Sequence, residues 1–236
     1  MQVDTAPRIA LIHALAHSIA PANAELDRSW PECVRMNLLD DSLSADLARS
    51  ATGLDARMTA RFVALAAYAI GNGAQGVLFT CSAFGPCIDA VAAQWPEIPV
   101  LKPNEAMIDD AVRAATTGGR SGRIGLVATF APTLASMPAE FPAGVEVIPV
   151  LAEGALAALD AGDVATHDWL AADAARRAQA MGCDVIALAQ FSLARAASAV
   201  ERAVPLPVLT TPASAVRRLR SRLERGTAGP DTRSSG

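Results

Sequence analysis

The segment GAQGVLFTCSAFGP (Gly73–Pro86) is the most informative part of the sequence, because the patterns of a strand, a cysteine and a helix start follow one another within it. Gly76–Cys81 begins with a continuous apolar run, which is typical of a strand covered on both faces in a parallel sheet. Pro86 suits the first turn of a helix. We therefore expect a helix to begin directly after Cys81.

This pattern recurs in the second half of the chain as GCDVIALAQFS (Gly182–Ser192). Two further pairs of segments match in the same order: RIALIHA (Arg8–Ala14) with RIGLVAT (Arg123–Thr129), and IPVLKPNEA (Ile98–Ala106) with LPVLTTPAS (Leu206–Ser214). The repeat predicts two similar halves with four strands each. The alternative is a chance likeness between ordinary strand–helix units.

The apolar runs predict strands at Arg8–Ala14, Cys33–Leu38, Gly76–Cys81, Pro99–Leu101, Arg123–Thr129, Val145–Leu151, Asp184–Gln190 and Pro207–Thr210. Three long helices are predicted between them. These are Leu54–Asn72, ended by Gly71-Asn72-Gly73, then Asn104–Thr116 with Asn104 as N-cap, and Asp163–Met181. Strands alternating with helices indicate a parallel α/β fold.

We expect two pseudo-symmetric open parallel-sheet domains with the active site in the cleft between them. Residues 1–101 with about 211–225 would form the first domain and residues 102–210 the second. Residues 226–236 are predicted to be a disordered tail.

Composition argues against several classes of protein. The chain has 236 residues, of which 52% are hydrophobic and 19% charged, so disorder is not expected. Four cysteines are too few for a disulfide scaffold, and a net charge of −4 disfavours nucleic-acid binding. The apolar run after Arg8 is too short for a membrane span, and no signal peptide is recognisable. We expect a cytoplasmic protein with reduced thiols and no membrane partner.

In open α/β folds, ligands bind beyond the carboxyl ends of the strands. Those ends are predicted to carry His13, Cys81, Lys102, Thr129, Gln190 and Thr210. Cys81 is the strongest candidate, because the start of a helix lowers a thiol pKa and binds anions. Such a thiol could move a proton at the carbon beside a carboxylate. The alternative is a small buried residue that only packs.

The segment GVLFTCSAFGP, the repeat, and the segment from Gly182 to Val216 together resemble the aspartate/glutamate/hydantoin racemase superfamily over residues 8–220. The resemblance implies two pseudo-symmetric α/β domains and chemistry without a metal or organic cofactor. It also implies two cysteines, one from each half, on opposite faces of the substrate's α-carbon. The superfamily includes maleate isomerases and arylmalonate decarboxylases.

The sequence departs from the racemase pattern where the second cysteine is expected. The repeat places Gln190 opposite Cys81, within Ala189-Gln190-Phe191, and a carboxamide does not titrate. Cys183 lies at the other end of the same predicted strand and does not replace it. Single-cysteine members of the superfamily include decarboxylases, although arylmalonate decarboxylases keep the cysteine of the second half.

The resemblance implies further substrate contacts. Ser82 and Ala83 would bind a carboxylate in the first half, and Thr129, Phe130, Phe191 and Ser192 would bind substrate in the second. His13 or His17 could supply a missing acid, although either could be a loop histidine without a role. Lys102, the single lysine, could pair with a substrate carboxylate or with Glu105. Cys33 and Cys87 are interpreted as packing residues.

No spacing of cysteine and histidine fits a zinc site, and no phosphate-binding glycine motif occurs. The expected function is a cofactor-independent isomerase of a small carboxylate that uses Cys81. The alternatives are a single-cysteine decarboxylase or lyase, and a non-catalytic two-lobed binding protein. The resemblance also implies a homodimer or a larger homo-oligomer.

Overall fold

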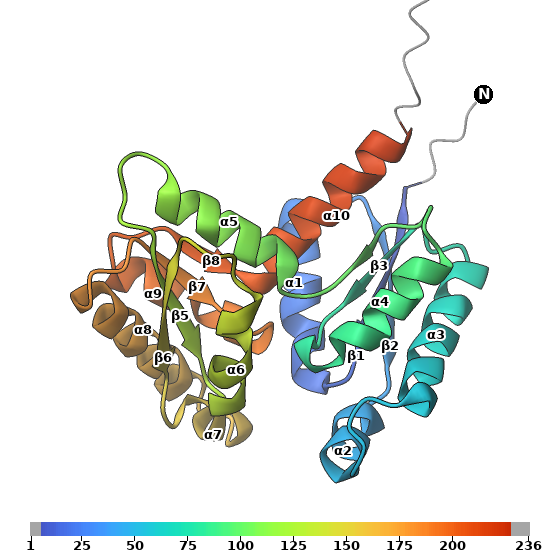
Figure 1. The fold of residues 1–236 in the computed structure, drawn as a ribbon, viewed down its shortest axis with the longest axis horizontal. Coiled ribbons are helices and arrows are strands. Elements are labelled where there is room, and N and C mark those ends of the chain that lie inside the picture. Colours follow the sequence, from blue (N-terminus) through green and yellow to red (C-terminus); the bar gives the residue numbers. More distant parts are fainter. Residues whose placement is uncertain (1–5, 228–236) are drawn as a thin grey trace, which may run out of the picture. The chain divides into compact units, whose positions relative to one another are not determined.

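The strands expected from the apolar runs form two four-stranded parallel sheets in the computed structural model, which describes residues 6–227 (Figure 1). The strand orders are β2-β1-β3-β4 and β6-β5-β7-β8. The described residues of Met1–Pro103 and Ala215–Gly236 form one compact unit, unit 1, and Asn104–Ser214 form unit 2. Helices flank each sheet, so the α/β fold class predicted from the sequence is confirmed.

Unit 1 packs α3 and α4 on one face of its sheet, around a core that includes Ile12, Val77 and Phe79. Helix α10 packs on the opposite face, where Leu219 lies against Gly76. The elements are β1 (Arg8–His13), η1 (Ala16–Ser18), α1 (Ile19–Ser29), β2 (Val34–Leu39), α2 (Ser42–Arg49), α3 (Ala56–Gly71), β3 (Gly76–Phe79), η2 (Ser82–Phe84), α4 (Gly85–Gln94), β4 (Val100–Leu101) and α10 (Thr211–Thr227).

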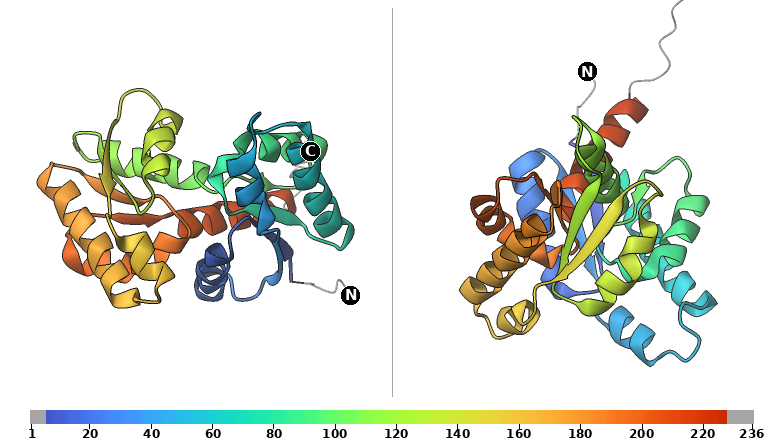
Figure 2. Two further views of the ribbon diagram at one scale, coloured as in Figure 1. Left: turned by 90° about the horizontal axis from the view of Figure 1, so that it is seen from below. Right: turned by 60° about the vertical axis from the view of Figure 1, so that its left-hand side comes forward.

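Unit 2 has the same plan, with the long helix α8 beside its sheet (Figure 2). Helices α8 and α9 pack around Val127, Ile186 and Leu188 on one face, and α5 covers Leu126 and Ala187 on the other. The elements are α5 (Glu105–Thr116), β5 (Arg123–Ala128), α6 (Ala131–Ser136), η3 (Met137–Glu140), β6 (Glu146–Leu151), α7 (Ala155–Asp160), α8 (Val164–Ala180), β7 (Val185–Leu188), η4 (Ser192–Ala196), α9 (Ala197–Ala203) and β8 (Val208–Thr210).

Strand registers in the two sheets follow the sequence repeat. Ile9 pairs with Gly76 in unit 1, and their repeat partners Ile124 and Val185 pair in unit 2. The pairing of Val77 with Val100 likewise corresponds to that of Ile186 with Val208. The alignment of Cys81 with Gln190 therefore holds in three dimensions as well as in the sequence.

Helix boundaries follow the expected signals in part. Asp55 and Asp163 cap α3 and α8 by accepting hydrogen bonds from Met58 N and Thr166 N, at 2.9 and 3.0 Å. The expected side-chain cap by Asn104 is not formed, because its backbone is already helical. Its buried Nδ2 has no hydrogen-bond partner among the described residues.

The predicted tail begins too early, since residues 226 and 227 belong to the end of α10. The rest of that tail, residues 228–236, lies outside the described residues.

Candidate active site

Cys81 lies two residues beyond the end of β3, in extended backbone. The next three residues, Ser82–Phe84, form the 3-10 turn η2, and α4 starts only at Gly85. Helical structure thus begins directly after Cys81, as expected, but its first turn is a 3-10 helix and the α-helix follows from Gly85. Cys81 is partly exposed, whereas Cys33, Cys87 and Cys183 are buried free thiols. Among the four cysteines, Cys81 is the one accessible to a ligand.

The surroundings of the Cys81 thiol raise its pKa, contrary to the sequence-based expectation. Burial disfavours the thiolate and has the largest effect. Hydrogen bonds from the backbone N–H of Ala83 and the side chain of Ser44 act in the opposite direction and are outweighed. The turn after β3 therefore does direct a donor at sulfur, but the thiol stays protonated at neutral pH. In this form Cys81 is a proton donor.

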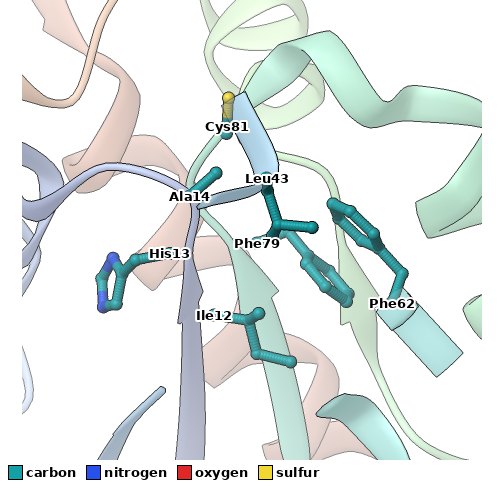
Figure 3. Close-up of a pocket in the computed structure, with 7 residues that line it drawn as sticks. All are labelled: Ile12, His13, Ala14, Leu43, Phe62, Phe79 and Cys81. Atoms are coloured by element: carbon teal, nitrogen blue, oxygen red, sulfur yellow. The ribbon is translucent and has the colours of Figure 1, made fainter. Parts of the chain in front are cut away.

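The surface beneath Cys81 is apolar (Figure 3). Ile12, Ala14, Leu43, Phe62 and Phe79 line a narrow recess with Cys81 and His13. The Phe62 ring stacks on Phe79 with centroids 5.3 Å apart and contacts Phe84 at 4.8 Å. This aromatic packing supplies the low-dielectric environment that keeps the thiol uncharged.

His13, the last residue of β1, is fully buried, and its ring points away from the apolar side chains of the recess (Figure 3). Its Nδ1 lies 2.9 Å from Thr80 Oγ1 and its Nε2 lies 3.0 Å from Asn37 Oδ1. Burial lowers the pKa of the imidazole, and the hydrogen bond with Asn37 opposes this effect. Both ring nitrogens have protein partners, so the geometry does not support His13 as the missing acid. His17 is exposed on η1.

Helix α2 brings a residue to the thiol that the sequence analysis missed. Ser44 interacts with the Cys81 thiol, and its hydroxyl donates to Ala14 O at 3.3 Å. Arg61 of α3 holds this short helix by contacting Asp40 at 2.5 Å and Asp46 at 2.7 Å. No sequence motif marks Ser44, because it reaches Cys81 only through the packing of α2.

Gln190, the repeat partner of Cys81, is held by Thr129 in unit 2. Its Oε1 accepts a 2.7 Å hydrogen bond from Thr129 N and a 2.9 Å bond from Thr129 Oγ1. The structure thus brings together two residues that the sequence analysis selected separately. Because the amide oxygen is occupied, the amide nitrogen is the group that Gln190 offers to a ligand.

The remaining predicted contacts differ in accessibility. Ser82 and Ala83 are exposed beside Cys81, and Phe130 is 49% exposed at the end of β5. Phe191 is only 3% exposed, while Ser192 is half-buried. Lys102 forms an ion pair with Asp89 of α4, with Nζ 2.6 Å from the carboxylate oxygen.

The other cysteines lie away from solvent. Cys87 Sγ is 3.5 Å from Thr59 Oγ1 between α4 and α3, and Cys183 lies beneath β5 beside Gly125. Burial raises the pKa of Cys183 and of Cys33. These three thiols are packing residues. Residues 6–227 contain no cluster of three potential metal-ligating side chains. Within the same range, no helix is both long and apolar enough to cross a membrane.

A family model described as Asp/Glu/Hydantoin racemase matches residues 22–219. A search of curated protein sequences finds no match.

Solved structures of low sequence identity share the fold. An allantoin racemase from Klebsiella pneumoniae is 16% identical, with a TM-score of 0.68 over 98% of this chain and 96% of that one. A glutamate racemase isoform from Bacillus anthracis is 13% identical, with a TM-score of 0.64 over 96% and 85%. An arylmalonate decarboxylase is 17% identical, with a TM-score of 0.57 over 97% of both chains.

Proposed function

Since the chain belongs to the Asp/Glu/Hydantoin racemase family, we propose that it is a cofactor-independent isomerase of a small carboxylic acid. Cys81 would act as a thiol acid/base at the carbon beside the carboxylate. The observation that carries this proposal is the partly exposed thiol two residues beyond β3, which receives a hydrogen bond from Ala83 N–H and interacts with Ser44. Both contacts favour the thiolate at the moment that it forms.

In the isomerase reaction, the fraction of Cys81 present as thiolate removes the α-proton. The electron pair of the C–H bond then moves into the carboxylate as an enediolate, which the backbone N–H of the exposed residue Ser82 would stabilise. Inversion requires that a proton arrive from the opposite face. Gln190 cannot donate one by titration, because an amide is neutral at all physiological pH values. Water would therefore supply that proton, while Gln190 would bind substrate by hydrogen bonding.

The second candidate is a single-cysteine decarboxylase or lyase. The protonated state of Cys81 specifically favours it. The bond between the α-carbon and a carboxylate would break, carbon dioxide would leave, and the electron pair would stay on the α-carbon. The Cys81 S–H would then deliver its proton to that carbon, and water would reprotonate the sulfur. Only one titrating group is required.

A panel of small mono- and dicarboxylic acids in deuterated water separates the two reactions. Proton NMR detects loss of the α-proton signal, chiral chromatography detects inversion, and gas analysis detects carbon dioxide. We expect turnover of at least one acid, and a loss of about 10²–10⁴-fold in Cys81→Ala, because this is the usual contribution of a proton-transfer group.

Cys87→Ala is the matched control, because this thiol is buried on α4 and contacts Thr59 instead of the recess. It should lower stability without removing turnover. If no acid turns over but one raises the unfolding temperature equally in the wild type and in Cys81→Ser, the protein is a binding protein and both catalytic proposals are wrong.

A further inference from the structure

The imidazole of His13 joins the carboxyl ends of three neighbouring strands. It lies on β1, contacts Thr80 just after β3, and contacts Asn37 on β2. Asn37 Nδ2 in turn donates to Asn23 Oδ1 on α1 at 3.2 Å. His13 is completely inaccessible to solvent and Thr80 is 6% exposed. This row of hydrogen bonds is buried at His13 and Thr80 and reaches the surface at Asn37, which is exposed. Hydrogen-bond networks of this kind hold their members in one geometry.

The donor and the acceptor of each hydrogen bond around His13 can be assigned, starting from the contact between Asn37 and Asn23. Because Asn37 uses Nδ2 on Asn23, its Oδ1 faces the ring and accepts from His13 Nε2–H. The neutral imidazole then has Nδ1 as an acceptor for the Thr80 hydroxyl at 2.9 Å, a shorter contact than the 3.4 Å from that hydroxyl to Ile12 O. No ring nitrogen is left for a substrate, so any role of His13 in catalysis is indirect.

The second half of the chain has a different polar contact in place of the hydrogen bond between His13 and Thr80. In that half, Gln190 stands where the first half has the Cys81 thiol. The strand registers place Ala128 and Ala189 at the positions of His13 and Thr80. The polar contact of unit 2 lies one residue further along each strand, between Thr129 and Gln190. It therefore involves the side chain of the residue that corresponds to Cys81. In unit 1 the polar contact lies one residue before Cys81, so it fixes the backbone and leaves the sulfur free.

We propose that His13 is a positioning residue that acts through Thr80 to hold the Cys81 thiol at its hydrogen-bond donors. With Thr80 fixed, the extended backbone at Cys81 keeps Sγ near Ala83 N–H and Ser44. Without the hydrogen bond between His13 and Thr80, the turn after β3 is free to shift, and sulfur loses contacts that stabilise the thiolate. The catalytic meaning of this role rests on the proposed function, but the position of the thiol can be measured without any substrate.

The test measures the rate at which iodoacetamide alkylates Cys81 as a function of pH, followed by peptide mass spectrometry. His13→Gln removes the Nδ1 acceptor and keeps an amide within reach of Asn37, and Thr80→Val removes only the hydroxyl. We expect both to move the pH dependence of alkylation upward, with about tenfold slower reaction at neutral pH for each unit of pKa. Thr80→Ser keeps the hydroxyl and should restore the wild-type profile.

His167→Gln is the matched control, because His167 is also fully buried but lies on α8 of unit 2, with Nδ1 2.8 Å from Asp168. It should reduce stability and leave the Cys81 profile unchanged. An unchanged or downward-shifted profile in folded Thr80→Val would overturn the positioning role, even if His13→Gln fails to fold. An upward shift together with no turnover of any acid would keep the positioning role and reject the proposed function.

Discussion

At the scale of single residues, Cys81 and Gln190 occupy equivalent positions of the repeat but differ in chemistry. Cys81 keeps an exchangeable proton, because burial outweighs the donors that favour its thiolate. Gln190 has no such proton, and Thr129 orients its amide through two hydrogen bonds to Oε1. The orientation leaves N–H groups to face a ligand, which suits an acceptor such as a carboxylate oxygen.

Gln190→Glu tests this orientation. The glutamate can still accept both hydrogen bonds from Thr129, so the unfolding temperature should change little. It loses the outward donor and adds a negative charge, so KM for a carboxylate substrate should rise about tenfold or more, since a hydrogen bond to a charged group contributes roughly 1.5–3 kcal/mol. Steady-state kinetics on the acid identified by the panel provides the measurement. An unchanged KM would show that Gln190 does not bind the carboxylate.

At the scale of secondary-structure elements, the contact between β5 and α8 depends on a glycine. A Cβ at Gly125 would lie 2.7 Å from Ala178 Cβ of α8 and 3.3 Å from Cys183 Sγ. Its repeat partner in unit 1 is Ala10, which is buried beneath α3 without such a conflict. Helix α8, with its row of buried alanines, therefore lies closer to its sheet than a side chain at position 125 permits.

Gly125→Ala should lower the free energy of unfolding by about 1–3 kcal/mol, because an added methyl in a packed core forces backbone movement. Urea unfolding followed by circular dichroism measures the change. Gly71→Ala is the control, since a Cβ at the end of α3 meets no atom within 4 Å, and alanine is the better helix former. Equal stability of Gly125→Ala and the wild type would mean that α8 can move away without cost.

Secondary-structure elements could be predicted from the sequence where a clear apolar run or a long helical pattern marks them. All eight expected strands and all three expected long helices occur, with ends displaced by one or two residues. Helix α2 was not predicted, because it has eight residues and no side-chain cap, and Arg61 on another helix holds it. Ser44 was therefore missed together with the element that carries it.

At the scale of the whole molecule, the same sheet topology is used twice around different polar residues. The registers of the two sheets agree, yet a buried histidine occurs in the sheet of unit 1 where the sheet of unit 2 has an alanine. A buried imidazole links folding to pH, because the unfolded chain binds a proton more readily than the folded one.

We predict that the protein loses stability as the pH falls below about 6.5. Burial lowers the pKa of His13 from 6.5, so both states carry a neutral imidazole above this value. Between 6.5 and the folded-state pKa, the unfolded chain binds the proton, and the free energy of unfolding falls by up to about 1.4 kcal/mol per pH unit. Below the folded-state pKa, this contribution no longer changes.

Urea unfolding of the wild type and of His13→Gln over this pH range isolates the effect. The variant should lose less stability on acidification than the wild type. Arg49 and Arg61 lower the pKa of Asp46 below its ordinary 3.8, so the stability that this carboxylate contributes is lost only below that pH, outside the range compared. Parallel curves for the two proteins would contradict the assignment to His13.

The two parallel sheets, the repeat and the place of Cys81 could be predicted from the sequence, because they follow from local apolar runs and from the order of residues along the chain. The behaviour of the candidate site residues depends on the folded arrangement. The raised pKa of Cys81, the two partners of His13, the Thr129–Gln190 pair and the contact of Ser44 all depend on which side chains meet and how much water they exclude. Burial and hydrogen bonding are properties of packed neighbours, and those neighbours come from distant parts of the chain.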